Sequence, residues 1–167
     1  MILRWMRRLA LGALALAVGL VAMGCDPAKA PESAQAAAKM TVTLKLDRSA
    51  YEHTAQGPAV LKAQLLVHNP GPGAVRLTFP SSQRYELEVR NERGQPVARW
   101  SQDRAFAMVL GEEEIPPGDK TYGIELKLAS EDGQPLPAGR YTARGWVTCT
   151  EPDAYSATAS FEIRPAR

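Results

Sequence analysis

The sequence has little of what most enzyme and metal sites are built from. It contains two cysteines and two histidines in 167 residues. No HExxH, paired CxxC, GxSxG, SxxK, P-loop or GxGxxG pattern occurs. His53 and His68 are expected at the surface, in a turn and at a strand end, and they form a poor ligand set for a metal. We therefore expect no metal, no cofactor and no enzyme, since catalysis would need a convergent polar cluster that the sequence does not indicate.

The chain also lacks an excess of positive charge once its first residues are set aside. Its formal charge is +2, but Arg4, Arg7 and Arg8 lie in the first 24 residues, where no acid occurs. The remainder holds 17 of the 20 basic residues and all 18 acidic ones. A near-neutral domain lacks the basic surface that nucleic-acid binding requires. We expect no nucleic-acid partner.

Long hydrophobic runs are confined to the start of the chain. Residues 9–24 carry no charge and follow three arginines. This run is shorter than the roughly 20 residues that span a bilayer, which disfavours the alternative of an uncleaved membrane anchor. A positive start, a short apolar core and small residues at its end are typical of a secretory signal. Residues 1–24 are therefore predicted to be a signal peptide.

The end of this signal resembles the lipobox of bacterial lipoproteins. Gly24 and Cys25 match the pattern of a small residue before a cysteine, whereas Ala22 and Met23 depart from the commonest residues. The resemblance implies that the Cys25 thiol carries a diacylglycerol and that the chain is cleaved before it. The protein would then be a membrane-anchored lipoprotein of the cell envelope, facing the periplasm or the exterior. The alternative is an ordinary secreted protein with a stray cysteine.

A flexible linker is expected after the lipidated cysteine. Residues 25–39 are rich in Ala, Pro, Lys, Glu and Ser and show no strand alternation. Asp26 resembles an inner-membrane retention signal of enterobacteria-like systems. Two or three acyl chains would anchor the protein durably, since each buried methylene contributes about 0.8 kcal/mol. With Cys25 acylated, Cys149 has no disulfide partner and is expected to be buried as a small apolar residue.

Residues 40–167 are dominated by alternation of apolar and polar side chains, which is typical of half-buried strands. No segment has a convincing helical period. Turn residues rich in Gly, Pro, Asn and Asp separate the strands. The pattern predicts an all-β antiparallel sandwich of eight or nine strands with Greek-key connections, and a closed barrel is the alternative. The expected strands are residues 42–46, 61–67, 75–79, 85–89, 97–100, 106–110, 122–128, 141–149 and 157–163.

The alternation also assigns side chains to faces. In residues 85–89 it places Glu86 and Glu88 in water, opposite Leu87 and Val89. Trp146 is expected to face outward, where it either packs under a loop or contributes to a binding surface.

The stretch from Val75 to Cys149 resembles the BsuPI domain, an intracellular proteinase inhibitor. The features that carry the resemblance, in order, are Phe79, Ser82-Gln83, residues 85–89, Gly94, residues 97–101, Phe106, Pro117-Gly118, residues 137–141 and Gly145. The preceding strand, Val60 to Asn69, also fits. The resemblance implies an immunoglobulin-like sandwich and suggests protease inhibition, although a fold alone does not establish a function.

Two segments are candidates for binding a protein partner. The first is Trp100, Ser101, Gln102, Asp103 and Arg104, because an exposed Trp beside polar residues is a common interface anchor. The alternative for Trp100 is a partly buried packing residue. The second is the acidic triplet at residues 112–114, whose alternative is a solvated loop.

The predicted function is a membrane-anchored lipoprotein that displays a BsuPI-like protein-binding domain. The resemblance makes a protease one expected partner, and another envelope protein is the other. The alternative function is a structural or accessory cell-envelope protein with no inhibitory activity.

Overall fold

The computed structural model describes residues 39–165. The predicted signal peptide, Cys25 and the linker as far as residue 38 lie outside the described residues. Within the described part of the chain, no helix has the length and hydrophobicity needed to cross a membrane.

The described chain is almost entirely β-structure, which confirms the predicted fold class. Its only helical element is one short 3-10 turn, η1 (Pro152–Tyr155). The strands are β1 (Thr41–Leu46), β2 (Ala50–Glu52), β3 (Val60–Asn69), β4 (Val75–Phe79), β5 (Tyr85–Asn91), β6 (Pro96–Arg99), β7 (Gly111–Ile115), β8 (Gly118–Lys127), β9 (Gly139–Val147) and β10 (Ser156–Arg164).

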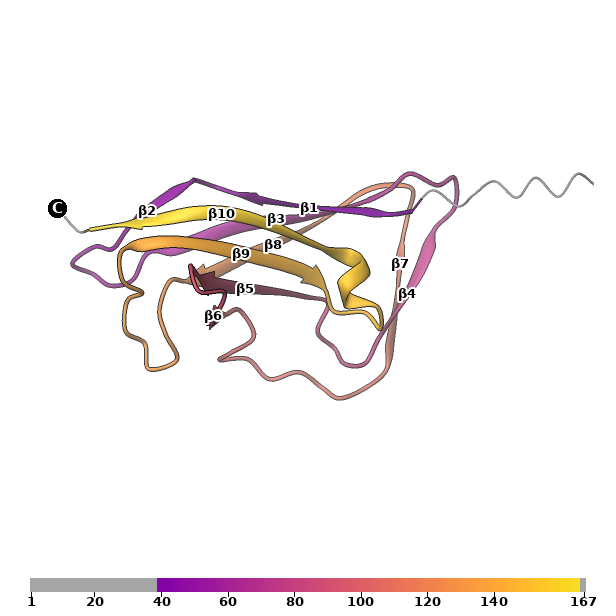
Figure 1. Cartoon of the computed structure of the whole chain (residues 1–167). Coiled ribbons are helices and arrows are strands. Elements are labelled where there is room, and N and C mark those ends of the chain that lie inside the picture. Colours follow the sequence, from indigo (N-terminus) through magenta and orange to yellow (C-terminus); the bar gives the residue numbers. More distant parts are fainter. Residues whose placement is uncertain (1–38, 166–167) are drawn as a thin grey trace, which may run out of the picture. The chain divides into compact units, whose positions relative to one another are not determined.

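The strands form an immunoglobulin-like β-sandwich (Figure 1). One sheet has the order β1-β3-β8 and the other the order β2-β10-β9-β5-β6, while β4 and β7 form a separate two-stranded ribbon. All pairs are antiparallel except β2 with β10. Neighbours such as β3 and β8, or β5 and β9, are far apart in sequence, as Greek-key connections require. β1 contacts β10 at one side of the sandwich, which leaves β6 and β8 as the edges on the other side.

The core lies between the two sheets and is built from the inward half of each alternating strand. In β3 every second side chain is buried, including Leu61, Leu65 and Val67. Gly145 of β9 faces this layer, and a Cβ at that position would lie 3.0 Å from carbon atoms of both Leu44 and Leu65. At Gly145 the absence of a side chain therefore leaves room for two leucines of the opposite sheet.

One expectation about β5 is wrong. Glu86 and Glu88 do alternate with Leu87 and Val89, but only 3% of Glu86 and 2% of Glu88 are exposed. β5 lies inside its sheet, between β9 and β6, and its two carboxylates bond polar groups of Gln83, Arg90, Arg99 and Ser101. Alternation distinguishes the two faces of a strand, but it does not show what covers the outer one.

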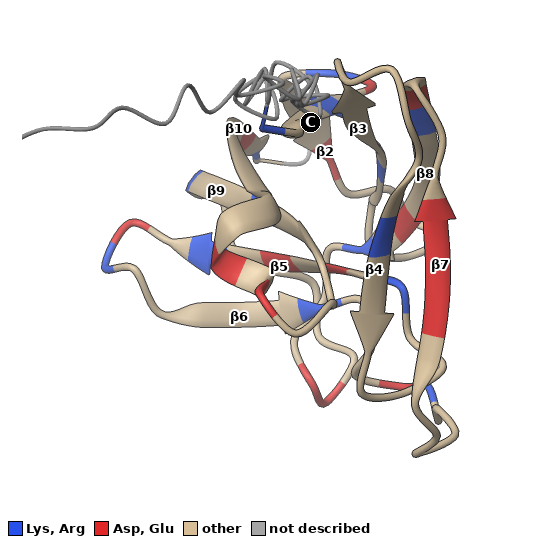
Figure 2. Cartoon of the chain, turned by 90° about the vertical axis from the view of Figure 1, so that its right-hand side faces the viewer, with Lys and Arg blue, Asp and Glu red and all other residues tan. Residues whose placement is uncertain are grey.

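The predicted strand at residues 106–110 is also wrong. This segment is irregular, and the strand lies directly after it, in β7, which contains the acidic triplet; the alternative of a solvated loop for that triplet is therefore wrong. The reason is pairing, because β4 provides a partner for residues 111–115 in the register Phe79 to Gly111 and Val75 to Ile115. Figure 2 shows β7 beside β4, with acidic residues along most of β7. Arg76 of β4 lies 3.4 Å from Glu112 and 3.2 Å from Glu114.

Cys149 lies two residues beyond the end of β9 and is 4% exposed, as predicted. Burial raises the pKa of its thiol above the ordinary value. The thiolate that nucleophilic chemistry requires is therefore disfavoured at neutral pH.

Candidate protein-binding site

The long connection from β6 to β7, residues 100–110, contains the first predicted binding segment. Trp100 is half-buried at its start, and its backbone N–H donates to the carbonyl of Leu87 at 2.8 Å. The indole ring packs against Tyr85, with ring centres 4.6 Å apart, and against Phe106 at 5.9 Å. Trp100 thus belongs to an aromatic cluster on the flank of the core.

Residues 101–104 form a tight turn that is hydrogen-bonded to Glu86 of β5. The Ser101 N–H donates to a carboxylate oxygen of Glu86 at 3.1 Å. The Arg104 N–H donates to the Ser101 carbonyl at 3.0 Å, and the Arg104 guanidinium lies over the Trp100 ring, 4.3 Å from its centre. Gln102, like its neighbours at positions 103 and 104, is exposed. The Trp100 ring is therefore packed within the chain by Tyr85, Phe106 and Arg104, which favours the alternative of a partly buried packing residue.

Two buried carboxylates hold this turn to the sheet. Glu86 accepts hydrogen bonds from the side chain of Gln83 and from Ser101. Glu88 pairs with Arg90 at 2.7 Å and with Arg99 of β6. Burial alone would raise the pKa of Glu88, but hydrogen bonds from Arg99 and Arg90 outweigh it and hold that pKa below its ordinary value.

An open groove of about 410 Å³ runs beside this turn, between the end of β6 and the end of β8. Trp100, Gln102, Asp103 and Arg104 form one wall. The facing wall carries charges of both signs, among them Glu125 and Lys127. The structure thus brings most of the first predicted segment into one groove, but not the acidic triplet, which lies on β7.

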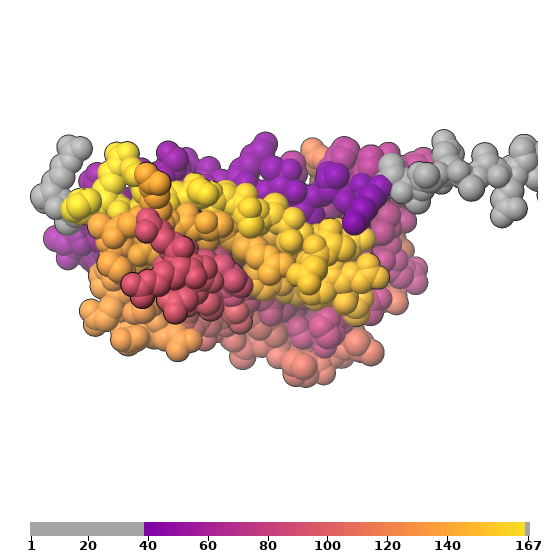
Figure 3. Space-filling model, viewed as in Figure 1, coloured from indigo at the N-terminus to yellow at the C-terminus, as the bar shows by residue number. Residues whose placement is uncertain are grey.

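The most exposed apolar side chains lie further along the same connection, at a place that the sequence analysis assigned to a strand. Exposed fractions are 86% for Met108, 58% for Val109 and 76% for Leu110. The one other large apolar side chain exposed in residues 39–165 is Val60, at 38%. Figure 3 shows the segment between β6 and β7 along the lower edge of the molecule. We call residues 108–110 the apolar tip.

The apolar tip begins directly after Ala107, whose backbone N–H and carbonyl are both hydrogen-bonded to Ser82. The Ala107 N–H donates to the Ser82 hydroxyl at 3.0 Å. The Ser82 N–H donates back to the Ala107 carbonyl at 2.9 Å. On its other side the tip ends at Gly111, which pairs with Phe79 in the β4–β7 ribbon. Three exposed residues therefore span two fixed points.

A cluster of charges fixes the ribbon to which the tip is joined. Glu113 is the inward residue of the acidic triplet, with its side chain 18% exposed, and it pairs with Lys120 of β8. The Tyr122 hydroxyl donates to the same carboxylate at 3.2 Å, and Nε of Arg84 lies 3.2 Å from its other oxygen. Arg84 also packs against Gly111, where an added Cβ would lie 2.8 Å from its guanidinium. A larger residue at position 111 would therefore require the end of the Arg84 side chain to shift.

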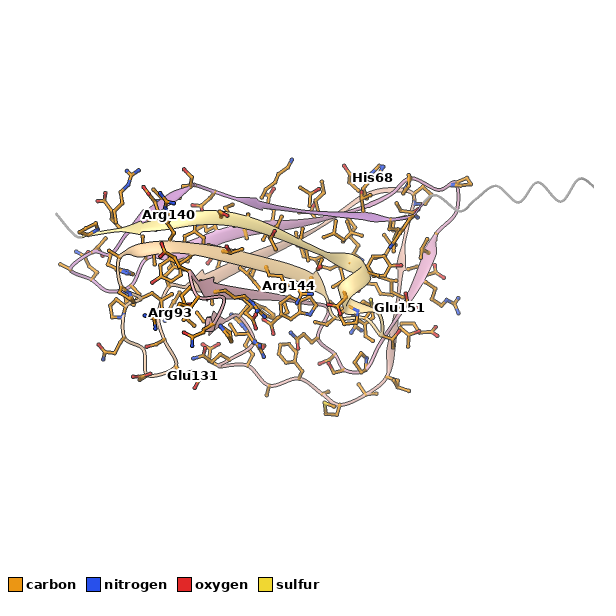
Figure 4. The ribbon with its side chains drawn as sticks, in the orientation of Figure 1. His68, Arg93, Glu131, Arg140, Arg144 and Glu151 are labelled. Atoms are coloured by element: carbon orange, nitrogen blue, oxygen red, sulfur yellow. The ribbon has the colours of Figure 1, made fainter. Side chains whose placement is uncertain are left out.

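Trp146 and the two histidines, the other residues that the sequence analysis singled out, lie away from this connection. Trp146 faces outward as expected, and the Arg144 guanidinium lies 5.1 Å from its ring centre and 2.6 Å from Asp153. Arg93 and Arg140 line one shallow pocket at one end of the domain, and His68, on β3 of the three-stranded sheet, lies toward the other end (Figure 4). His68 bonds Asp119 at 2.6 Å, whereas His53 bridges the chain by accepting from the Ala59 N–H and donating to the Leu136 carbonyl.

Solved structures with a similar fold come from unrelated kinds of protein. They include a β-glucosidase from Erythrobacter marinus (14% identity, TM-score 0.44, covering 75% of this chain and 15% of that chain) and the CARDB domain of the PF1109 protein from Pyrococcus furiosus, in complex with di-metal ions (14%, 0.41, 77% and 94%). A third is the sporulation control protein Spo0M from Bacillus subtilis (13%, 0.42, 77% and 50%). This chain thus spans less than a sixth of the β-glucosidase. No curated protein sequence matches it.

The family comparison is more specific. The family model of BsuPI, described as intracellular proteinase inhibitor, matches residues 44–152, from within β1 to the start of η1. The match includes both walls of the groove, Ser82 and the apolar tip. It covers about two thirds of the sequence, and on that extent the chain belongs to the BsuPI family of intracellular proteinase inhibitors.

Proposed function

We propose that this protein is a membrane-anchored lipoprotein whose domain binds another protein of the cell envelope through the apolar tip, as a proteinase inhibitor. The observation that carries the proposal is the run of three consecutive exposed apolar side chains at residues 108–110. An exposed apolar patch adds nothing to the stability of a monomer, and such patches commonly mark interaction sites. The family's description supports a protease as the partner.

The binding surface is preorganised. Ser82 holds Ala107, and the Arg84–Glu113–Lys120 cluster holds β7. A loop that is already ordered loses less conformational entropy when it binds, which is how rigid loops gain affinity. The exposed carboxylates of Glu112 and Glu114 beside the tip oppose an anionic lipid surface, and this favours a protein partner over the membrane itself.

Anchoring is tested with the full chain in bacterial cells. We expect Cys25→Ser to abolish labelling with radioactive palmitate and to move the protein from the membrane fraction to the soluble fraction. The Asp26→Ser variant serves as the control and should stay acylated. A Cys25→Ser protein that remains in the membrane would mean that the leader, and not an acyl group, is the anchor.

Binding is tested with a photo-crosslinking amino acid at position 109 and, as the control, at the exposed position 158 of β10. We expect a covalent adduct with one envelope protein from position 109 and none from position 158. A protease in the adduct supports inhibition, whereas a non-protease at fixed stoichiometry supports the accessory role. Equal labelling from both positions would contradict binding through the tip.

A further inference from the structure

The apolar tip has the geometry of a segment that enters a cleft. It is three residues long, strongly exposed, and bounded by Ala107 on one side and Gly111 on the other. Its side chains are 58–86% exposed, so a partner must enclose them to gain from their burial. A flat partner surface would cover one of them well, whereas a cleft with successive pockets would cover all three.

Met108 differs from its two neighbours in the tip. It is the most exposed of the three and the first residue after the tether. Its side chain is unbranched, with three rotatable bonds, and adapts to a deep pocket. Val109 is branched at Cβ and stiff, and Leu110 directly precedes strand β7. Met108 is thus the side chain best placed to extend into a pocket of the partner.

The absence of charge near the tip also indicates which kind of protease pocket would bind it. No charged residue occurs from Ala105 to Gly111. A protease pocket that recognises Lys or Arg through a buried carboxylate would find no cation in this tip. Its carboxylate would then stay buried without a partner, which is costly. A deep apolar pocket would bury Met108 fully, whereas a shallow one would leave much of it in water.

On these grounds, and resting on the proposed function, we propose that the apolar tip occupies the active-site cleft of an endoprotease and that Met108 determines specificity. It fills a deep apolar primary pocket of the kind found in chymotrypsin, and neither the shallow pocket of elastase nor the acidic pocket of trypsin accepts it as well. The interaction is non-covalent, and the tethers at Ala107 and Gly111 hold the tip in place while it is bound.

The test uses the full chain in detergent and inhibition constants for bovine chymotrypsin, elastase and trypsin. The wild type should inhibit chymotrypsin more strongly than the other two. Met108→Arg should weaken inhibition of chymotrypsin by about 10- to 100-fold, the factor that corresponds to burying one apolar side chain, and should create inhibition of trypsin. Leu110→Arg is the matched control, since Leu110 is 76% exposed, and should change each constant less than Met108→Arg does.

Two further measurements make the outcome decisive. Chymotrypsin whose active site is blocked by a small covalent inhibitor should no longer bind the wild type, because the cleft is filled. Thermal melting should be the same for both variants and the wild type, since position 108 is 86% exposed. If the wild type inhibits but Met108→Arg and Leu110→Arg behave alike, the role of Met108 is overturned and the inhibitor function stands. If none of the three proteases is inhibited, the proposed role of Met108 is overturned, and the crosslinking experiment at position 109 decides the proposed function separately.

Discussion

Ser82 forms hydrogen bonds with both backbone polar groups of Ala107, the N–H and the carbonyl. The Ser82 hydroxyl accepts from the Ala107 N–H at 3.0 Å, and the Ser82 N–H donates to the Ala107 carbonyl at 2.9 Å, although 25 residues separate the two. The connection from β6 to β7 has no regular secondary structure along residues 104–110, so this pair replaces the ladder of hydrogen bonds that a strand would have. It fixes the backbone directly before the apolar tip.

Replacing Ser82 with Ala should loosen the apolar tip while leaving the sandwich intact. The variant loses one of the two hydrogen bonds, and we expect the free energy of unfolding to fall by about 0.5–1.5 kcal/mol. Hydrogen exchange of the amides at residues 107–110 should accelerate more than exchange in β3. The control is Ser160→Ala, at an exposed position of β10. Equal exchange in Ser82→Ala and wild type would show that the tip is held by other contacts.

Replacing Gly145 with Ala should destabilise the domain. The added Cβ would lie 3.0 Å from carbons of Leu44 and Leu65, so the two sheets must separate or the leucines must change rotamer. Such overpacking costs about 1–3 kcal/mol, measurable by urea denaturation. Gly123→Ala is the matched control, since nothing lies within 4 Å of its Cβ position in β8. A destabilisation no greater than that of the control would mean that the sheets do not meet at Gly145.

Glu88 should contribute to the pH dependence of stability. Because its pKa is lowered in the folded state, its contribution is fully present above the ordinary value of 4.5 and is lost as the pH falls through the lower, folded-state pKa. Glu88→Gln should therefore be less stable than wild type by about 1–3 kcal/mol at neutral pH, and the difference should shrink in acid. The measurement is thermal unfolding from pH 7 to pH 2.

The control for Glu88 is Glu114→Gln on β7. The Glu114 side chain is 63% exposed and pairs with Arg76, so its loss should change stability by less than about 0.5 kcal/mol. A difference between Glu88→Gln and wild type that stays constant down to pH 2 would exclude the carboxylate's charge as its cause.

Trp100 should matter for packing more than for binding. Trp100→Ala removes ring contacts with Tyr85 and Phe106, and we expect a loss of about 2–3 kcal/mol in the free energy of unfolding. Trp100→Phe should recover most of it and leave the affinity for the partner within about threefold, which corresponds to about 0.7 kcal/mol. A folded Trp100→Phe protein that binds tenfold more weakly would instead identify Trp100 as a contact residue.

Several features were predictable because they are local. Alternation located most strands, the inward face of β3 and the burial of Cys149. Turn residues placed the β5–β6 hairpin, where Asn91 and Gly94 form a backbone hydrogen bond at 2.9 Å. The acylation of Cys25 stays a prediction, because that residue lies outside the described part of the chain.

The candidate site was only partly predictable. The residues from Trp100 to Arg104 do lie in the connection that leads to the apolar tip, but the tip belongs to an apolar run, residues 106–110, that resembles a buried strand. An apolar run at residues 106–110 becomes a strand only if a neighbouring strand pairs with it, and β4 pairs with residues 111–115 instead. A pattern of side chains does not show which other strand lies close enough to pair with the segment.

By itself, the sequence determined that the chain forms half-buried strands, because the direction of successive side chains along a strand depends only on the local backbone. Only the tertiary structure decided that Glu86 and Glu88 are buried beneath arginines and a turn, and that Met108 is exposed beyond a tether at Ser82. These outcomes depend on contacts between residues distant in the chain, and such contacts exist only once the sheets have assembled.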